Sequence, residues 1–379
     1  MKPLCSTLAA LLCGWHSLPA FAADDRPDDL TRALEAIREA HNLPALTAAI
    51  VTPDGATEIV ATGVRKAGRP IRVTTRDRWH LGSDTKVMTA TLAGTFVAEG
   101  KLSWDDKLPD LFPELASRIS PKLKDVTYAD LLTHRAGLIE NLPWAEIAAQ
   151  GGPLRKQRAR AAKTLLTTPP EYPVGSFHYS NASYVLAGAI LERIGGKSWE
   201  ELMTERLFRP LGMKSAGFGG VGTPGQVDEP WGHEEDGRPV AHNGPRADNA
   251  AVMGPAGTVH ASLEDWAKFL ADQLRGANGQ KALLPPKIYA AIQTPPPGET
   301  YAFGWGVQRR RWAGGEVFTH AGSNTMNYAI CWLAPRRQFG VVACTNQAGP
   351  AATAACDEAI QLMIRRHSAP ESNSLTSTP

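Results

Sequence analysis

The sequence has almost no surplus of charge of either sign. It carries 40 Lys and Arg residues against 38 Asp and Glu residues, a formal net charge of +2. Proteins that hold a phosphate backbone usually have a strong basic surplus, so this balance argues against nucleic acid as a partner. Disordered chains combine low hydrophobicity with high net charge, whereas 43% of these residues are hydrophobic. The composition is that of a folded globular protein.

Long hydrophobic runs are also missing, since no segment reaches the roughly 18 apolar residues that a membrane-spanning helix needs. A short apolar run, Leu8 to Leu12, follows Lys2, and Ala20-Phe21-Ala22 forms a small-x-small pattern. These features predict a cleaved secretory signal peptide at residues 1–22. We therefore expect a periplasmic or secreted protein without a membrane span.

Cysteine is scarce, with five residues in the chain, two of them inside the predicted signal peptide. The remaining three, Cys331, Cys344 and Cys356, form no C-x-x-C or Cys/His cluster, which gives no metal-ligand spacing. Cys331 and Cys344 flank a predicted hairpin turn at residues 335–338, which would place them nearly opposite each other. Burial as small hydrophobic residues is the favoured interpretation, and a cross-strand disulfide is the alternative.

Three familiar functional motifs are either absent from this sequence or not expected to have their usual function. The sequence lacks G-x-S-x-G, the nucleophile turn of α/β-hydrolases. Residues 220–225 match G-x-G-x-x-G, but Pro224 interrupts them and no helix is predicted to follow, so a loop is expected rather than a dinucleotide site. A basic run between Arg155 and Lys163 has no interleaved aromatic residues, and we expect it to be a solvated helix face.

The apolar periodicity predicts strands near both ends of the chain and helices between them. Helices are expected at 28–41, 83–99, 127–134, 181–194 and 351–366, and strands at 46–51, 58–64, 303–308, 316–320, 328–334 and 339–345. This order predicts an α+β fold in which the two chain ends build one antiparallel sheet with flanking helices, and an all-helical subdomain is inserted. The sheet subdomain is expected at residues 28–82 and 255–366, and the helical subdomain at 83–254. Together they form one domain over residues 23–367, followed by a disordered tail at 368–379.

The most informative stretch is Ser83-Asp84-Thr85-Lys86, an S-x-x-K spacing at the start of a long apolar helix. Residues three apart share a helix face, so the Ser83 hydroxyl and the Lys86 amine can approach each other. Serine is a weak nucleophile until a base takes its proton, and burial can lower the pKa of a lysine enough for that task. Ser83 and Lys86 are therefore candidate catalytic residues.

Two further motifs fit the same chemistry. Tyr179-Ser180-Asn181 is a Y-x-N at the entry of another helix, where a tyrosine near a buried lysine can be held partly as phenolate. Taken alone, this tripeptide is more typical of a helix cap. His320-Ala321-Gly322-Ser323 ends a predicted strand, where glycine lets a substrate lie against the strand and the next amide can face an oxyanion.

In this order, the three motifs resemble those of the penicillin-recognising serine hydrolases. That superfamily contains class C β-lactamases, D-alanyl-D-alanine carboxypeptidases, D-aminopeptidases and family VIII esterases. The segment from Leu131 to Leu138 is similar to its LLTHTSGL segment, and Phe303 to Gly306 to its FGYGW strand. The resemblance covers about residues 28–366.

The resemblance implies a β-lactamase-like fold and hydrolysis of an ester or amide through an acyl-serine, with neither metal nor organic cofactor. It implies Ser83 as nucleophile, and Lys86 with Tyr179 as the proton-handling pair. Asn181, His320, Gly322 and Ser323 would contact the substrate, with the amides of Ser83 and Ser323 as the oxyanion hole. His134 is expected to be structural, and His80 and His178 to lie behind the site or at the surface.

The third motif departs from the Lys-Thr-Gly of class C β-lactamases. Lysine offers a permanent cation to a substrate carboxylate, whereas His320 near neutral pH is mostly an uncharged donor, and Ala321 lacks a hydroxyl. We therefore expect weak β-lactamase activity. D-amino-acid peptides, neutral esters or lactones, and β-lactams all remain open as substrates, as does a penicillin-binding sensor that is acylated without turnover.

Overall fold

The computed structural model describes residues 29–240 and 247–368. The predicted signal peptide lies outside these residues, as does the predicted tail apart from Ser368, which ends the last helix. Within the described ranges, no helix combines the length and the apolar character needed to cross a membrane.

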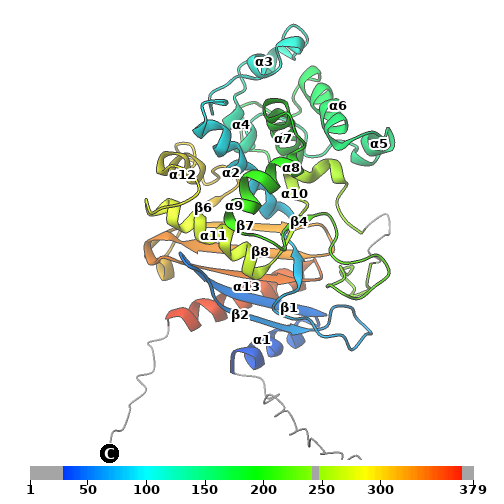
Figure 1. Cartoon of the computed structure of the whole chain (residues 1–379), viewed down its shortest axis with the longest axis vertical. Helices are drawn as coiled ribbons and strands as arrows, with labels where there is room; N and C mark the ends of the chain where they lie inside the picture. Colours follow the sequence, from blue (N-terminus) through cyan, green and yellow to red (C-terminus); the bar gives the residue numbers. More distant parts are fainter. Residues whose placement is uncertain (1–28, 241–246, 369–379) are drawn as a thin grey trace, which may run out of the picture.

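The centre of the molecule is a six-stranded antiparallel sheet built from both ends of the chain (Figure 1). Its strand order is β2-β1-β9-β8-β7-β6, so the N-terminal hairpin pairs directly with the last strand. The bounds are β1 Ala45–Thr52, β2 Gly55–Gly63, β6 Gly306–Arg310, β7 Gly315–Ser323, β8 Tyr328–Ala334 and β9 Phe339–Thr345. This arrangement confirms the predicted α+β fold.

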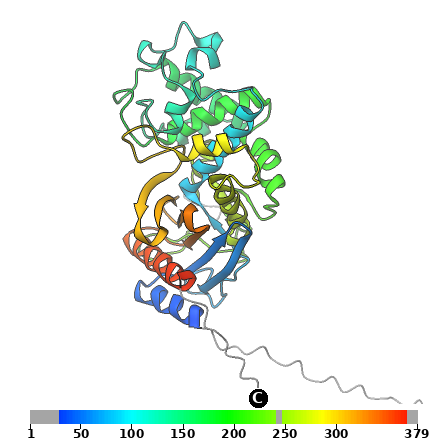
Figure 2. The same cartoon turned by 90° about the vertical axis from the view of Figure 1, so that its left-hand side faces the viewer.

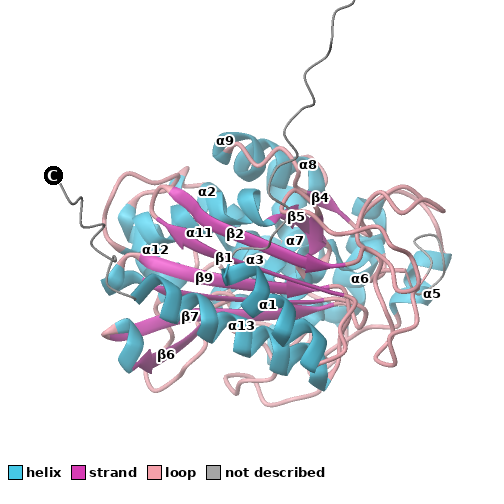
Figure 3. Cartoon of the chain, turned by 90° about the horizontal axis from the view of Figure 1, so that it is seen from below, coloured by secondary structure: helices cyan, strands magenta, loops and turns pink. Residues whose placement is uncertain are grey.

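Helices cover both faces of this sheet. Helices α1 (Asp29–Ala40) and α13 (Pro350–Ser368) pack against each other and against one face (Figure 3). The other face meets α11 (Leu263–Ala277), with α12 (Pro286–Gln293) beside it. Alternate residues of β1 point to opposite sides: Ala49 belongs to the core beneath α11, and Ile50 to the core beneath α1 and α13. Strand β1 is therefore buried on both of its faces.

The helical region stands on the side of the sheet that carries α11, and Figure 2 shows the two parts stacked along the long axis. Its helices are α2 Thr85–Ala98, α3 Leu108–Leu111, α4 Tyr128–Leu132, α5 Trp144–Ala149, α6 Leu154–Thr167, α7 Asn181–Gly195, α8 Trp199–Met203, α9 Arg209–Leu211 and α10 Gly254–Gly257. Helix α2 is buried nearly all around because its apolar, Ala and Thr side chains face neighbours on every side. It links the sheet to the helical region.

Two details of the predicted fold were wrong. The inserted region is not entirely helical, because β4 (Gly217–Phe218) pairs in a small sheet with β5 (Val259–Ser262), which also pairs with β3 (Arg78–His80). Strand β6 begins at Gly306 rather than at residue 303. Gly304 has a φ of +83°, and a Cβ there would lie 2.8 Å from the backbone N of Val87. A turn packed against α2 therefore replaces the start of the expected strand.

The three cysteines within the described residues, Cys331, Cys344 and Cys356, are buried and free. Cys331 pairs in register with Val342, and Cys344 pairs with Ala329, so the two are offset by two residues rather than directly opposite. The structure thus confirms the favoured interpretation of these residues as small buried side chains.

The basic run on α6 is not simply a solvated face, because Arg158 is completely buried. Its guanidinium donates to Glu192 (2.6 Å) and to Glu200, and to the carbonyl oxygens of Ala251 and Val252 (3.1 and 3.0 Å). Spacing along one helix could not reveal these partners, since they come from three other segments. Arg158 is therefore a tie between α6, α7, α8 and the segment that precedes α10.

Candidate active site

Ser83 lies in a short 3-10 turn, Gly82–Asp84, that leads from β3 into α2. It is the one partly exposed residue in the otherwise buried stretch from Leu81 to Met88. Gly82 has a φ of +50°, a left-handed conformation that favours glycine. The turn therefore presents the Ser83 hydroxyl while the residues around it are packed.

The side chain of Lys86 is fully buried, and its Nζ lies within hydrogen-bond distance of three oxygen atoms. These are Oγ of Ser83 at 3.0 Å, Oδ1 of Asn181 at 2.8 Å and the carbonyl oxygen of Ala256 at 2.7 Å. Burial lowers the pKa of Lys86 well below its usual value, although the nearby acidic groups of Asp84 and Glu140 oppose this shift. A neutral amine beside the Ser83 hydroxyl can accept its proton.

Tyr179 reaches the same point from the loop before α7. Its hydroxyl interacts with the Ser83 side chain, and its ring centroid lies 4.8 Å from Nζ of Lys86. Burial raises the pKa of Tyr179 above that of free tyrosine, and the hydrogen bond from Ser83 only partly offsets this. The phenolate suggested by the motif is thus disfavoured. Burial favours the uncharged forms of both members of the pair, which makes the Lys86 amine the stronger base.

Asn181 is the first residue of α7, and Ser180 before it is the N-cap, with its hydroxyl accepting from the Ser183 amide at 3.0 Å. The Asn181 Oδ1 accepts from Lys86, and its Nδ2 donates to Oδ1 of Asn141 at 2.9 Å. These two bonds orient the amide and leave its second N–H free to meet a substrate. Asn141 was not predicted from the sequence, because it lies just beyond the LLTHTSGL-like segment and belongs to no motif of its own.

The third motif, His320–Ser323, packs directly against the turn Gly82–Asp84 that contains Ser83, and no side chain lies between their backbones. A Cβ on Gly322 would lie 2.6 Å from the Ser83 backbone N, and a Cβ on Gly82 would lie 2.4 Å from the Ser323 backbone N. Only glycine fits at either position. The close approach brings the amides of Ser83 and Ser323 to neighbouring positions, as an oxyanion hole requires.

The end of β7 that carries this motif has an open side. Strand β6 pairs with β7 from Gly315 to Thr319, and in the described residues this pairing does not continue to His320–Ser323. Strand β8 pairs with the other side through Ser323. An extended substrate could therefore add its backbone to the free edge beside Ser83.

A hydrogen-bonded chain of aromatic residues leads to His320. The Ser180 amide donates to Nδ1 of His134 at 3.0 Å, so the neutral ring carries its proton on Nε2. Nε2 of His134 and Nε2 of His320 each lie 3.2 Å from the Tyr301 hydroxyl oxygen. If the protons follow this order, His320 carries its own on Nδ1, a buried atom without a hydrogen-bond partner. Tyr301 is a second residue that the motifs did not reveal.

Both imidazoles in this chain are uncharged. Burial lowers the pKa of His134 well below its usual value and that of His320 to about 3. His134 lies among the rings of Tyr179, Tyr184 and Tyr301, in line with the structural role expected for it. His178 instead stacks on Tyr172 with ring centroids 4.0 Å apart.

Asp84, between the nucleophile and its lysine, is buried and faces away toward β8. The Sγ of Cys331 donates to its Oδ1 at 3.3 Å. Burial raises the pKa of Asp84 well above its ordinary value, and the hydrogen bond from Cys331 only partly offsets this rise. Asp84 thus connects the turn that contains Ser83 to strand β8 of the sheet.

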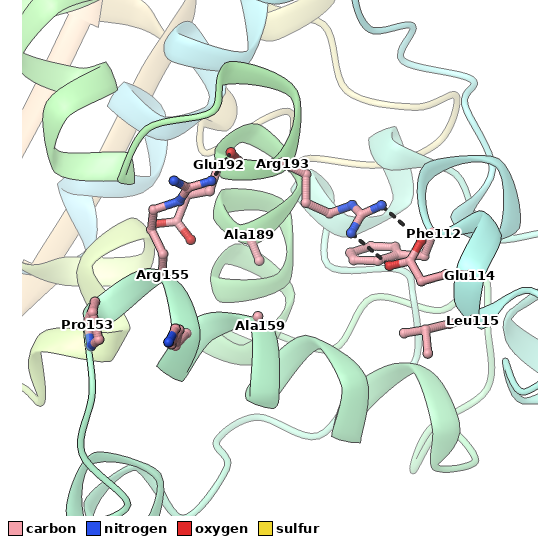
Figure 4. A pocket seen from close by; sticks show the side chains of 10 residues that line it. Phe112, Glu114, Leu115, Pro153, Arg155, Ala159, Ala189, Glu192 and Arg193 are labelled. Carbon is pink, nitrogen blue, oxygen red and sulfur yellow. Dashed lines mark hydrogen bonds and ion pairs between the residues drawn. The ribbon is translucent and has the colours of Figure 1, made fainter.

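A surface pocket of 430 Å³ lies elsewhere, between α6, α7 and the loop around Phe112 (Figure 4). Its arginines are already engaged: Arg193 donates to Glu114 at 2.7 and 3.0 Å, and Arg155 to the carbonyl oxygen of Gly196 at 2.7 Å. None of its lining residues belongs to the three motifs. This pocket is therefore separate from the candidate site at Ser83.

The chain is similar to several known proteins. Penicillin-binding protein 4 of Amycolatopsis lactamdurans is 30% identical over 179 residues, which are 47% of this chain and 46% of that protein. A Beta-lactamase of Escherichia coli (strain K12) is 24% identical over 327 residues, 86% of this chain and 77% of that protein. The chain thus spans less than half the length of the first of these relatives.

Among solved structures, a D-alanine carboxypeptidase from Burkholderia cenocepacia superposes with a TM-score of 0.69 at 20% identity, covering 88% of this chain and 97% of the other. An antiparallel sheet with a helical insertion and a serine–lysine pair at their junction defines the class of penicillin-recognising serine hydrolases. The sequence profile of the family described as Beta-lactamase matches residues 30–363. The chain belongs to the beta-lactamase family.

Proposed function

We propose that this protein is an exported serine hydrolase that cleaves an ester or amide bond through an acyl-Ser83 intermediate. The observation that carries the proposal is the buried Nζ of Lys86, 3.0 Å from the Ser83 hydroxyl oxygen. A lysine kept uncharged by burial can act as a general base at neutral pH. No metal or organic cofactor enters the proposed reaction.

In the proposed acylation, the Lys86 amine takes the proton of the Ser83 hydroxyl as Oγ attacks the substrate carbonyl. The amides of Ser83 and Ser323 stabilise the oxyanion of the tetrahedral intermediate. The proton then passes from Lys86 to the leaving group through the Tyr179 hydroxyl, which contacts Ser83. Water reverses the sequence in deacylation, with the same pair accepting and returning its proton.

The surroundings of the site favour an uncharged substrate. Ile139 and Phe177, which flank the Tyr179 loop, are 36% and 42% exposed, and the Phe177 ring lies 5.4 Å from that of Tyr301. Glu140, also exposed, adds negative charge close to Lys86. Apolar side chains and an acidic group, together with an uncharged His320, disfavour a substrate carboxylate. A neutral ester or lactone is therefore the preferred substrate class.

Hydrolysis of D-amino-acid peptides is the second candidate, supported by the fold shared with the D-alanine carboxypeptidase and by the open edge of β7. A penicillin-binding sensor that is acylated once would keep the same residues. A purified-protein screen with p-nitrophenyl esters, nitrocefin and D-alanyl peptides separates these functions.

Steady turnover of an ester, with a transient acyl adduct by intact mass, is the expected result of that screen. A single stoichiometric burst would indicate the sensor, and preferred release of D-alanine would indicate the peptidase. Absence of any adduct or turnover would contradict the proposed function. Mass analysis of the protein from the periplasm tests the cleavage after Ala22.

A further inference from the structure

A buried carboxylate connects the two segments that flank the proposed oxyanion hole. Nδ1 of His80, at the end of β3, accepts from the Gly82 amide at 3.1 Å. Nε2 of the same ring lies 2.8 Å from Oδ1 of Asp248. That Oδ1 also accepts from Nδ2 of Asn324 at 3.0 Å. One oxygen atom thus faces groups from two distant parts of the chain.

The two contacted segments are the direct neighbours of the oxyanion-hole amides. Gly82 precedes Ser83, and Asn324 follows Ser323. Asn324 also accepts the amides of Met326 and Asn327 on its Oδ1, at 3.3 and 3.0 Å, which fixes the turn after β7. A displacement of Asp248 would therefore reach both amides at once.

His80 and Asp248 are not the base and acid of a Ser-His-Asp triad, although Ser83 is only three residues from His80. The Gly82 amide occupies Nδ1, and Asp248 faces Nε2, so neither ring nitrogen is free to take the Ser83 proton. Lys86 already lies at that proton. The dyad must act on the shape of the site and not on proton transfer.

The network is buried and charged, as a rigid support requires. The His80 side chain is 1% exposed and that of Asp248 is 12% exposed. Burial alone would raise the pKa of Asp248, but the interactions of its carboxylate with His80 and Asn324 outweigh burial and lower this pKa. Asp248 is therefore an ionised carboxylate at neutral pH, and such bonds are stronger than those between neutral groups.

The residue after Asp248 supports the base in the same way. Nδ2 of Asn249 donates to the carbonyl oxygen of Gly257 at 2.8 Å. Gly257 follows Ala256, whose carbonyl accepts from Lys86. The segment at Asp248 and Asn249 thus contacts three of the backbone segments that form the site.

We infer that Asp248 is a positioning residue that holds the amides of Ser83 and Ser323 at the spacing of the oxyanion hole, through His80 on one side and Asn324 on the other. The inference rests on the proposed acyl-Ser83 function and adds a residue that touches neither substrate nor nucleophile.

The test compares Asp248→Ala with Asp248→Asn in the full mature protein. Loss of one oxyanion donor costs about 10²- to 10³-fold in kcat, and a misaligned pair should cost less. For Asp248→Ala we expect kcat for a p-nitrophenyl ester to fall by about 10- to 100-fold while KM changes by less than about threefold. Asp248→Asn keeps an oxygen in place and should recover most of the loss.

Two readouts separate positioning from general destabilisation. The affinity for an alkyl boronic acid, which binds Ser83 as a tetrahedral anion, should fall by the same factor as kcat. Asn324→Ala should cause a similar loss, and the double variant with Asp248→Ala should lose little more. Asp272→Asn is the matched control, because this carboxylate is also buried, with its side chain 1% exposed, but bonds to Tyr289, away from the motifs. It should lower the Tm and leave kcat and the boronic acid affinity unchanged.

Hydrogen exchange of the peptide that contains Gly82 and Ser83 gives a result independent of activity. Exchange should be faster in Asp248→Ala and unchanged in Asp272→Asn. Unchanged kcat, boronic acid affinity and exchange in Asp248→Ala would overturn the inference while the wild type still turned over. If exchange is faster in Asp248→Ala but the wild type forms no acyl adduct, only the proposed function is contradicted.

Discussion

Nζ of Lys86, in the first turn of α2, lies 3.0 Å from Oγ of Ser83, in the 3-10 turn that precedes this helix. The lysine has no solvent to stabilise its charge, so its position costs the protein stability as long as it is protonated. The same burial supplies the base that the proposed reaction needs. Function and stability are thus opposed at this residue.

Ser83→Ala should abolish both turnover and the acyl adduct. By analogy with other serine nucleophiles, the loss in kcat/KM should be on the order of 10³-fold or more, with the Tm close to that of the wild type. Ser176→Ala, at an exposed serine before the second motif, is the control and should be fully active. More than about a tenth of wild-type activity in Ser83→Ala would contradict the nucleophile assignment.

Lys86→Ala and Tyr179→Phe should each cost nearly as much activity as the double variant, because the two groups act as one proton-transfer unit. Lys86→Arg should not restore activity, since a guanidinium keeps its proton at any workable pH. The measurement is kcat/KM for the best ester found in the screen. If the two single losses multiplied in the double variant, the shared unit would be disproved.

The lowered pKa of Lys86 also predicts how stability depends on pH. Between its folded pKa and about 10.4, the unfolded chain binds a proton at this residue that the folded chain does not. The unfolding free energy of the wild type should therefore rise with pH in this window, by up to about 1.4 kcal/mol per pH unit, relative to Lys86→Met. Urea unfolding of both proteins at several pH values from 7 to 10 measures the difference. A difference that does not change with pH would mean that Lys86 is protonated when folded.

His320→Lys should shift preference toward substrates with a free carboxylate. A charge-assisted hydrogen bond is worth about 1.5–3 kcal/mol, so kcat/KM for a carboxylate substrate relative to its methyl ester should rise at least several-fold. A histidine of ordinary pKa would make this ratio climb in the wild type below about pH 6.5. Because the pKa of His320 is about 3, we expect the wild-type ratio to stay flat between pH 5.5 and 8.5. A ratio unchanged by the substitution would show that His320 does not face the carboxylate.

Tyr301→Phe should break the hydrogen-bonded link between His134 and His320, because it removes the hydroxyl that lies between the two rings. Loss of hydrogen bonds of this kind costs about 0.5–1.5 kcal/mol each, so kcat/KM should fall by roughly 2- to 10-fold, or more if both bonds contribute. Nitrogen NMR of labelled histidine should show His320 protonated on Nδ1 in the wild type and a mixture of tautomers in the variant. Tyr128→Phe, at a fully buried tyrosine with one long bond to a carbonyl, is the control. Protonation of His320 on Nε2 in the wild type would contradict the proposed order of protons.

Arg158→Ala should destabilise the fold by about 3–5 kcal/mol, because it leaves Glu192 buried without its partner. The exposed Lys163 of the same helix is the matched control, and Lys163→Ala should change stability by less than about 0.5 kcal/mol. Chemical denaturation of the three proteins measures this contrast. Equal stability of the two variants would show that the buried ion pairs contribute no net stability.

The sequence by itself determined the elements whose cause is local. Strands at residues 328–334 and 339–345 occur where the apolar runs predict them, because the residues that form them and the turn between them are contiguous. The first helix and the helix that begins at Asn181 follow from periodicity and capping. The S-x-x-K pair needed only the local geometry of the 3-10 turn and the start of α2 to bring its two side chains together.

Only the tertiary structure decided which distant groups surround that pair. The Ala256 carbonyl, Asn141 and Tyr301 contact the motif residues from other segments, and nothing in their neighbouring sequence marks them. The same holds for Arg158, which spacing assigned to solvent although Glu192 and Glu200 lie beside it in the fold. Burial sets the pKa values of Lys86 and His320, and burial depends on every segment that packs against them. A motif therefore predicts which residues can react, while the packing of remote segments decides their charge state and their geometry.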